Sequence, residues 1–273
     1  MTKISHLSLI CALVIPFTLA FSASFASAEI QTRTVIYSIE DKQFEGFLAL
    51  PENLKEGESA PGVLIVHDWM GLQDDTKDRA IQIAKLGYPA FAADIYGQGI
   101  RPTSSEEAGA QAGKYKKNTD LFRKHVTESW KTMLSQPEFD STASVAIGYC
   151  FGGTGVLELA RSGADIQGVV SFHGNLATDK PASAPDAPKI TASIFVMHGA
   201  VDPFVPESEV VAFIEEVNAA KADWQLISFS DAVHSFTKEA AGDDPSTGSA
   251  YNKQADQRSW AYFQTFLKEI SQR

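Results

Sequence analysis

Apolar residues along this chain form short unbroken runs, and the stretches between these runs carry apolar residues at helical spacing. Unbroken apolar runs are typical of strands buried on both faces of a parallel sheet, whereas helical spacing is typical of amphipathic helices. The predicted strands are 62–66, 90–93, 144–150, 166–172, 190–197 and 224–229, and the predicted helices are 75–86, 151–162, 207–219 and 252–270. This alternation predicts an α/β fold with a doubly wound, mostly parallel sheet flanked by helices.

The part of the chain before the first buried strand follows a different pattern. Residues 32–39 alternate between apolar and polar side chains, and residues 44–50 continue after a short turn at Asp41 and Lys42. Two such segments joined by a tight turn predict an N-terminal antiparallel hairpin that precedes the parallel strands.

Two segments are not explained by the simple alternation of strands and helices. Residues 103–136 are polar and helical in character, with weak points expected at Gly109 and Gly113, and they are long enough to include a short lobe over the sheet. Residues 240–249 are rich in Gly, Asp, Pro and Ser, which predicts a mobile loop.

Residues 1–28 have the form of an export signal. Lys3 supplies a basic start, Leu7 to Phe21 is apolar, and Ala26-Ser27-Ala28 has the small-x-small form of a signal-peptidase site. The apolar stretch is shorter than the roughly 20 residues of a transmembrane helix. We therefore expect cleavage after residue 28, a single domain over residues 29–273, and a periplasmic or secreted protein of bacterial type with no membrane contact after cleavage.

Charge and cysteine content restrict the possible partners. The formal net charge is −11, and the chain has no basic run, which argues against a nucleic-acid partner. Of the two cysteines, Cys11 lies within the signal, so Cys150 is the single thiol expected in the mature chain. A single thiol cannot form an internal disulfide. We expect a monomer or a weak oligomer.

The sequence around Cys150 predicts a strand, a sharp turn and a helix, with the cysteine at the turn. The spacing Gly148-x-Cys150-x-Gly152 is the nucleophile-elbow pattern of the α/β-hydrolases, with sulfur in place of a serine hydroxyl. Residues two positions from the elbow must be small so that the strand and the helix can approach each other. The alternative is a buried structural cysteine behind a glycine-rich turn, because free cysteine is often buried.

Two later residues follow predicted strands in the order that this class requires. Asp202 comes shortly after the strand 190–197, and His234 lies in the loop after the strand 224–229. In α/β-hydrolases the nucleophile is followed in sequence by the acid and then by the histidine, and all three lie at the C-terminal ends of strands. The sequence thus predicts Cys150 as nucleophile, His234 as base and Asp202 as orienting acid.

Together these motifs resemble those of the dienelactone hydrolase family, the carboxymethylenebutenolidase-like proteins, over nearly the whole mature chain. The resemblance rests on Val66-His67-Asp68-Trp69-Met70-Gly71, Ala93-Asp94-Ile95-Tyr96, Gly148-Tyr149-Cys150-Phe151-Gly152-Gly153, His198-Gly199-x-x-Asp202 and His234-Ser235-Phe236. It implies an α/β-hydrolase fold and hydrolysis of a small activated ester or lactone through a Cys-His-Asp triad and a thioester acyl-enzyme. No cofactor is implied.

The resemblance also implies roles for residues around the triad. The backbone N–H groups of Phe151 and Trp69 would form the oxyanion hole. In the family a glutamate contacts the resting thiol, and this chain has Asp68 at the matching position, one methylene shorter. Tyr149 and Met70 are candidate substrate contacts, beside the elbow and in the loop after the strand 62–66 (residues 67–71, here called the oxyanion loop).

The chain departs from the family where substrate charge is recognised. Family members that act on a charged lactone bind its carboxylate through arginines. Before the elbow strand this chain has Glu106 and Glu107 instead, and four residues after His234 it has Lys238. Lysine offers a point charge and not a bidentate fork. We therefore treat Lys238 as a candidate substrate contact and expect neutral activated esters or lactones to react at least as well as a charged dienelactone.

Other polar residues at strand ends have simpler interpretations. His67, His173 and His198 follow three separate strands without the spacing of metal ligands, so we expect loop or core histidines and no metal. Asp94 precedes the nucleophile in sequence and is predicted to be a structural hydrogen-bonding residue. Asp231, although close to His234 in sequence, is expected to face solvent.

Two alternative functions stay open on the sequence alone. The first is a general periplasmic carboxylesterase or thioesterase, which would use the same residues. The second is a non-catalytic or thiol redox-sensing protein. A sensor thiol normally pairs with a resolving cysteine, and the mature chain has no second cysteine.

Overall fold

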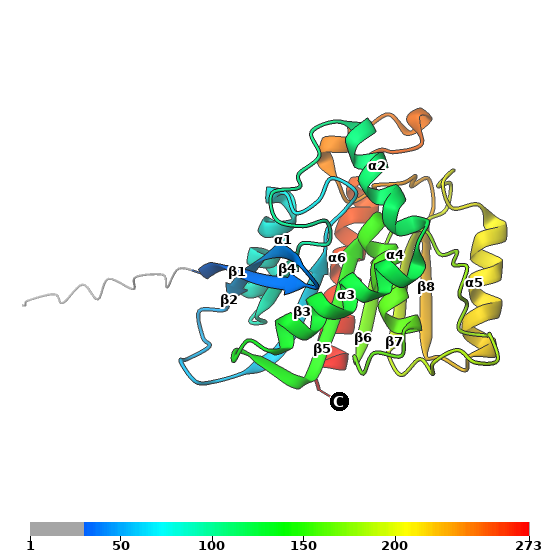
Figure 1. The fold of residues 1–273 in the computed structure, drawn as a ribbon. Coiled ribbons are helices and arrows are strands. Elements are labelled where there is room, and N and C mark those ends of the chain that lie inside the picture. Colours follow the sequence, from blue (N-terminus) through cyan, green and yellow to red (C-terminus); the bar gives the residue numbers. More distant parts are fainter. Residues whose placement is uncertain (1–29, 273) are drawn as a thin grey trace, which may run out of the picture.

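Eight strands form one sheet in the order β1-β2-β4-β3-β5-β6-β7-β8 in the computed structural model, which describes residues 30–272 (Figure 1). The expected signal segment 1–28 lies outside the described residues. The strands are β1 Gln31–Ile39, β2 Lys42–Leu50, β3 Ala60–Val66, β4 Ala90–Ala93, β5 Phe139–Tyr149, β6 Gly168–Phe172, β7 Ser193–Gly199 and β8 Trp224–Phe229. β1, β2 and β4 are joined antiparallel, and all other neighbours are parallel, which confirms the predicted sheet and its N-terminal hairpin.

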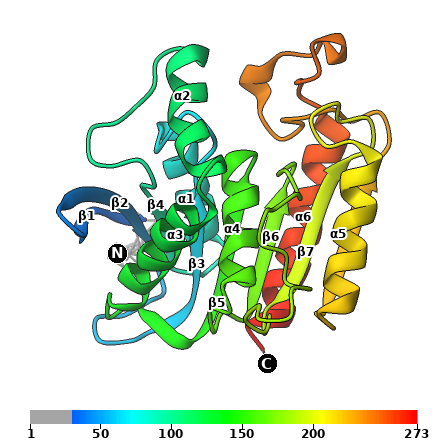
Figure 2. The same ribbon diagram turned by 45° about the vertical axis from the view of Figure 1, so that its right-hand side comes forward.

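Helices cover both faces of the sheet. They are α1 Asp74–Lys85, α2 Ser105–Lys116, α3 Thr119–Leu134, α4 Phe151–Arg161, α5 Glu207–Ala219 and α6 Lys253–Ile270. Leu64 and Val66 of β3 belong to the core on the face covered by α3, α4 and α5, whereas Val63 and Ile65 belong to the core on the face covered by α1 and α6, as the alternation of side chains along a strand requires. Figure 2 shows α4 before the sheet and α6 behind it. Among the described residues, no helix combines the length and apolarity needed to cross a membrane.

Two sequence predictions about local structure are wrong in detail. The segment 103–136 forms two helices, but the break lies at Asn118, whose side chain accepts a hydrogen bond from the N–H of Leu121 and so caps α3. Gly109 and Gly113 lie within α2. Helix propensity predicts weakness at glycine, but a capping residue decides where the second helix begins. The hairpin turn consists of residues 40 and 41, one position earlier than expected.

The segment after β8 contains more local structure than its composition indicated. Residues 240–249 overlap two short 3₁₀ turns, Glu239–Ala241 and Pro245–Thr247. Ser249 then forms a parallel bridge with His234. The segment therefore returns to the end of the sheet where the functional candidates lie, in the orange part of Figure 2.

Candidate active site

Cys150 occupies a strained turn between β5 and α4. Its φ of 53° and ψ of −112° are uncommon for a residue other than glycine. A side-chain carbon added at Gly148 would lie 2.0 Å from the carbonyl oxygen of Gly152, and one added at Gly152 would lie 2.1 Å from that of Val66. Only glycine fits at these two positions, which is the steric reason for the sequence pattern around Cys150.

The structure brings Cys150, His234 and Asp202 together at the C-terminal ends of β5, β8 and β7. Nε2 of His234 lies 3.0 Å from Sγ of Cys150, and Nδ1 of His234 lies 2.8 Å from Oδ2 of Asp202. An ionised carboxylate can only accept hydrogen bonds, so Nδ1 carries a proton and donates it to Asp202. Nε2 is therefore the ring atom that can exchange a proton with the thiol.

Backbone contacts hold the acid and the histidine in place. The second carboxylate oxygen of Asp202 accepts the N–H of Phe204 at 2.8 Å. The N–H of His234 donates to the carbonyl of Gly248 at 3.2 Å, and the carbonyl of His234 accepts the N–H of Ala250 at 3.0 Å. The segment after the 3₁₀ turns thus fixes the backbone of His234, a role that its loop-like composition does not reveal.

The electrostatic environment favours a protonated His234. Burial opposes the charged imidazolium, but the hydrogen bonds to Asp202 and Cys150 outweigh burial and raise the pKa of His234 to about 10. An imidazolium beside a thiol sulfur stabilises the thiolate form, which is the nucleophilic form of cysteine. The geometry and the charge distribution therefore both suit nucleophilic chemistry at Cys150.

Two backbone N–H groups are of interest here: that of Phe151, which follows Cys150 in the chain, and that of Trp69, which lines the same cavity as Cys150. Among residues 30–272, neither the N–H of Phe151 nor that of Trp69 has a hydrogen-bond acceptor. Phe151 is the first residue of α4, where N–H groups are unpaired and the helix dipole is positive. An oxyanion that forms next to Cys150 would meet favourable charge there.

Asp68 has partners other than the thiol. Its Oδ1 accepts the N–H of Met70 at 2.8 Å, and its Oδ2 lies 2.5 Å from Nζ of Lys238. Within the described part of the chain, Cys150 is not among its hydrogen-bond partners. Lys238 also pairs with Asp75 at 2.9 Å. The shorter aspartate thus engages the neighbouring lysine, and the positive charge of Lys238 is balanced by two carboxylates.

A cavity of about 760 Å³ opens over Cys150. Trp69, Met70 and Tyr149 line it, together with Lys238. The ring of Tyr149 stacks on that of Phe172, with the centroids 4.6 Å apart. Tyr149, Met70 and Lys238 are thus placed where a substrate bound at Cys150 would meet them.

The sequence did not single out one wall of this cavity. There the guanidinium of Arg79 lies 4.5 Å from the ring of Trp260 and 5.3 Å from that of Tyr149. Trp260 belongs to α6 and Arg79 to α1, which are far apart in the chain. Amphipathicity predicts that each helix has a buried face, but it does not predict which two side chains meet at the edge of that face.

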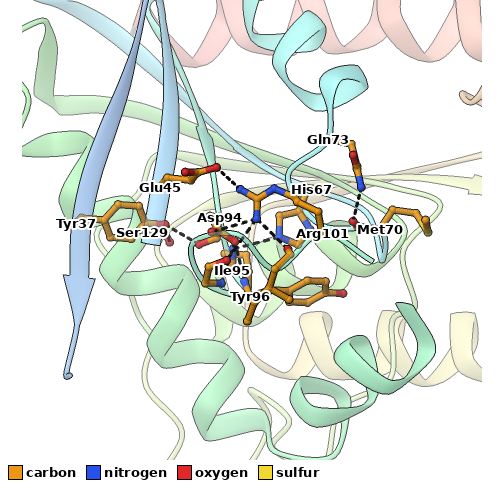
Figure 3. Close-up of polar contacts among 12 residues, drawn as sticks. Tyr37, Glu45, His67, Met70, Gln73, Asp94, Ile95, Tyr96, Arg101 and Ser129 are labelled. Carbon is orange, nitrogen blue, oxygen red and sulfur yellow. Dashed lines mark hydrogen bonds and ion pairs between the residues drawn. The ribbon is translucent and has the colours of Figure 1, made fainter. Parts of the chain in front are cut away.

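The remaining polar candidates lie outside the triad. Asp94 accepts the N–H groups of Tyr96 and Gly97 at 3.0 Å each, and Arg101 lies beside it (Figure 3). Asp231 is exposed. Among the described residues, no group of three His, Cys, Asp or Glu side chains is arranged to hold a metal ion. His173 lines the cavity, its ring centroid lies 5.3 Å from that of His234, and its Nε2 lies 2.8 Å from the hydroxyl oxygen of Thr237.

The α/β-hydrolase class is defined by a mostly parallel sheet and by three residues in a fixed chain order, namely a residue at a strained elbow, an acid and a histidine. Within this class, the chain belongs to the dienelactone hydrolase family, whose model matches residues 44–271. The chain is therefore a dienelactone hydrolase-like hydrolase.

Individual relatives agree with this assignment. A crystal structure of the dienelactone hydrolase-like promiscuous phosphotriesterase P91 from metagenomic libraries is 34% identical, with a TM-score of 0.82 over 89% of this chain and 99% of that chain. A protein of Saccharolobus solfataricus, provisionally named a carboxymethylenebutenolidase, is 23% identical over 88% of this chain and 99% of its own length. Protein usf of Aquifex pyrophilus is 28% identical over 82% of this chain and 92% of its own.

Proposed function

We propose that this protein hydrolyses activated esters or lactones of the dienelactone type, with Cys150 as nucleophile, His234 as base and Asp202 as orienting acid. One observation supports this most directly: His234 Nε2 lies 3.0 Å from Cys150 Sγ while Asp202 holds the opposite ring nitrogen. A buried structural cysteine would not need such partners. We propose acyl transfer to water as the reaction.

Acylation begins with attack by the Cys150 thiolate on the substrate carbonyl. A carbon–sulfur bond forms and the carbonyl oxygen takes the negative charge, which the N–H groups of Phe151 and Trp69 stabilise. When the tetrahedral intermediate collapses, the carbon–oxygen bond to the leaving group breaks. The leaving group receives a proton from His234, and a thioester stays on Cys150.

Deacylation uses the same groups in the reverse order. His234, now neutral, removes a proton from water, and the resulting hydroxide attacks the thioester carbonyl. Release of the acid product regenerates the sulfur of Cys150. Since a thiolate is itself a good leaving group, the first step needs a substrate whose own leaving group competes with it. Enol lactones, aryl esters and thioesters meet this condition.

A substrate panel with purified protein tests this proposal. We expect hydrolysis of an aryl acetate, an enol lactone or a thioester, and we expect loss of that activity after alkylation of Cys150 with iodoacetamide. A redox-sensing or non-catalytic protein would give no turnover with any of these substrates. Turnover that survives complete alkylation would exclude Cys150 as the nucleophile.

A second candidate activity comes from the phosphotriesterase relative. A neutral aryl phosphotriester has an activated leaving group, and attack by the Cys150 thiolate would form a sulfur–phosphorus bond and release the aryl oxide. Hydrolysis of that intermediate by water would complete the reaction. Adding a neutral aryl phosphotriester to the panel compares the two activities on the same protein.

Substrate charge should matter little or should act against anions. Lys238 is already paired with Asp68 and Asp75, and the cavity lining holds five carboxylates against two cations, namely Asp68, Asp75, Asp78, Glu239 and Asp256 against Arg79 and Lys238. We expect the methyl ester of a carboxylate-bearing enol lactone to have at least the kcat/KM of the free acid. A strong preference for the free acid that disappears in Lys238→Ala or Arg79→Gln would contradict this expectation.

The pH profile should report the proton on His234. Burial lowers and the bonds to Asp202 and Cys150 raise its pKa, to a net value of about 10. Above that pH the leaving group loses its proton donor, so kcat/KM for an enol lactone should hold until about pH 9 and then fall. Asp202→Asn removes one bond that raises the pKa, so the fall should move to lower pH. An unchanged alkaline limb in that variant would contradict the assignment.

We further propose that residues 1–28 are removed during export and that the mature protein is periplasmic or secreted. The proposal rests on the Lys3 start, the apolar stretch and the Ala26-Ser27-Ala28 site. Intact-mass analysis of protein recovered from the periplasm should show a chain that begins at Glu29. Recovery of a chain that retains residues 1–28 would contradict both the cleavage and the location.

A further inference from the structure

We propose that His67 is a positioning residue for the oxyanion hole, because it fixes the peptide that carries the N–H of Trp69. The inference rests on the proposed acyl transfer at Cys150. His67 directly follows β3 and is fully buried. His67 is not among the residues that line the cavity, and its effect on catalysis would be exerted through the backbone.

The hydrogen bonds of His67 define the protonation of its ring. Nε2 lies 3.1 Å from the backbone nitrogen of Ile95, and Nδ1 lies 2.6 Å from the carbonyl oxygen of Asp68. A backbone N–H can only donate, so Nε2 accepts, and the proton of a neutral imidazole is then on Nδ1. Nδ1 therefore donates to the carbonyl of Asp68. Burial lowers the pKa of His67 and keeps the ring neutral.

That carbonyl belongs to the same peptide unit as the N–H of Trp69. A peptide unit is planar and trans, so its C=O and its N–H point in opposite directions. By holding the Asp68 carbonyl on the buried side, His67 directs the Trp69 N–H away from the buried side. The N–H of Gly71 donates to the same carbonyl at 3.2 Å, and the hydroxyl of Tyr96 donates to the next carbonyl, that of Trp69, at 3.0 Å.

The turn at Ile95, whose N–H donates to Nε2 of His67, is itself fixed by hydrogen bonds. The carbonyl of Ile95 accepts the hydroxyl of Tyr115 at 2.6 Å and also contacts Nδ1 of His125 at 2.9 Å. The neighbouring carbonyl of Asp94 accepts the hydroxyl of Tyr37 at 2.6 Å. Figure 3 shows His67 together with Ile95, Asp94 and Tyr37 of this network. A rigid ring between a rigid turn and the oxyanion loop sets the direction of a single N–H, as preorganised catalysis requires.

The test replaces His67 with a ring that cannot form hydrogen bonds. In His67→Phe we expect kcat to fall about 100-fold with little change in KM, because bonds to an oxyanion form only in the transition state. Alkylation of Cys150 by iodoacetamide forms no oxyanion, so its rate should stay within about twofold of the original. His67→Asn places an amide N–H near the position of Nδ1, so its kcat should be about tenfold higher than that of His67→Phe.

A matched control separates positioning from general damage. Trp130→Phe removes another buried hydrogen bond, which Nε1 of Trp130 on α3 donates to the hydroxyl oxygen of Ser144 on β5 at 3.2 Å. This variant should have a lower thermal midpoint but an unchanged kcat. Unchanged kcat in His67→Phe would overturn the inference, as would a parallel loss of kcat and of alkylation. If His67→Phe does not fold, His67→Asn decides: a loss of about tenfold in kcat with normal alkylation supports the inference, and unchanged kcat overturns it. Absence of Cys150-dependent hydrolysis in the unsubstituted protein would overturn the proposed function, and this inference with it.

Discussion

Cys150→Ala and His234→Ala should each remove nearly all hydrolysis, with kcat/KM reduced roughly 10⁴- to 10⁶-fold. In the proposed mechanism the sulfur forms the covalent intermediate, and the imidazole, 3.0 Å away, exchanges a proton with it. Because the two side chains act as one unit, the double variant should be little worse than either single variant. The measurement is kcat/KM on an aryl acetate with each purified variant, after thermal unfolding has shown that each one folds.

The neighbouring aspartates supply the controls for this experiment. Asp202→Asn should cost less than loss of Cys150 or His234, since it removes the orienting partner and leaves the reacting pair. Asp231→Asn should retain full activity, because Asp231 is exposed and its backbone φ of 59° suits asparagine. Turnover close to normal in Cys150→Ala would show that the elbow is not the reacting site. Equal losses in Asp202→Asn and Asp231→Asn would contradict the assignment of the acid.

The order of the elements could be predicted because periodicity and burial are coupled in this fold. The runs that became β3 to β7 are apolar on both faces, so they could be neither surface helices nor edge strands. The elbow could be recognised for a similar reason, because the space at Gly148 and Gly152 excludes any side chain. Steric restrictions of this kind determine the residue type at individual positions, so they can be recognised from the sequence.

The partners of charged side chains could not be predicted in the same way. The sequence places Asp68 and Lys238 170 positions apart, and only the fold brings them within hydrogen-bond distance. Arg79 and Trp260 meet because α1 and α6 share one face of the sheet. The sequence predicts that His67 is a loop or core histidine, and nothing in its neighbourhood reveals that its ring forms hydrogen bonds with two different loops. Such pairings depend on tertiary geometry, which cannot be read from the periodicity of the sequence.

Gly152→Ala should destabilise the protein severely and abolish activity. The added methyl group would lie 2.1 Å from the carbonyl oxygen of Val66 and 2.6 Å from that of His67. Both contacts are with backbone atoms at the end of β3, so α4 must move away from the strand and carry the elbow with it. We expect a loss of about 3 kcal/mol or more in the free energy of unfolding, measured by urea denaturation.

Gly109 of α2 provides the control that separates crowding from loss of glycine itself. A side-chain carbon at Gly109 would have no atom within 4 Å, so Gly109→Ala should stabilise the helix by about 0.5–1 kcal/mol. Even if Gly152→Ala folds, the oxyanion loop and the elbow can no longer keep their spacing, because the methyl group stands between Val66 and α4. Activity should therefore be lost more completely than stability. A Gly152→Ala protein with normal unfolding and normal kcat would show that the close approach of β3 and α4 is not required.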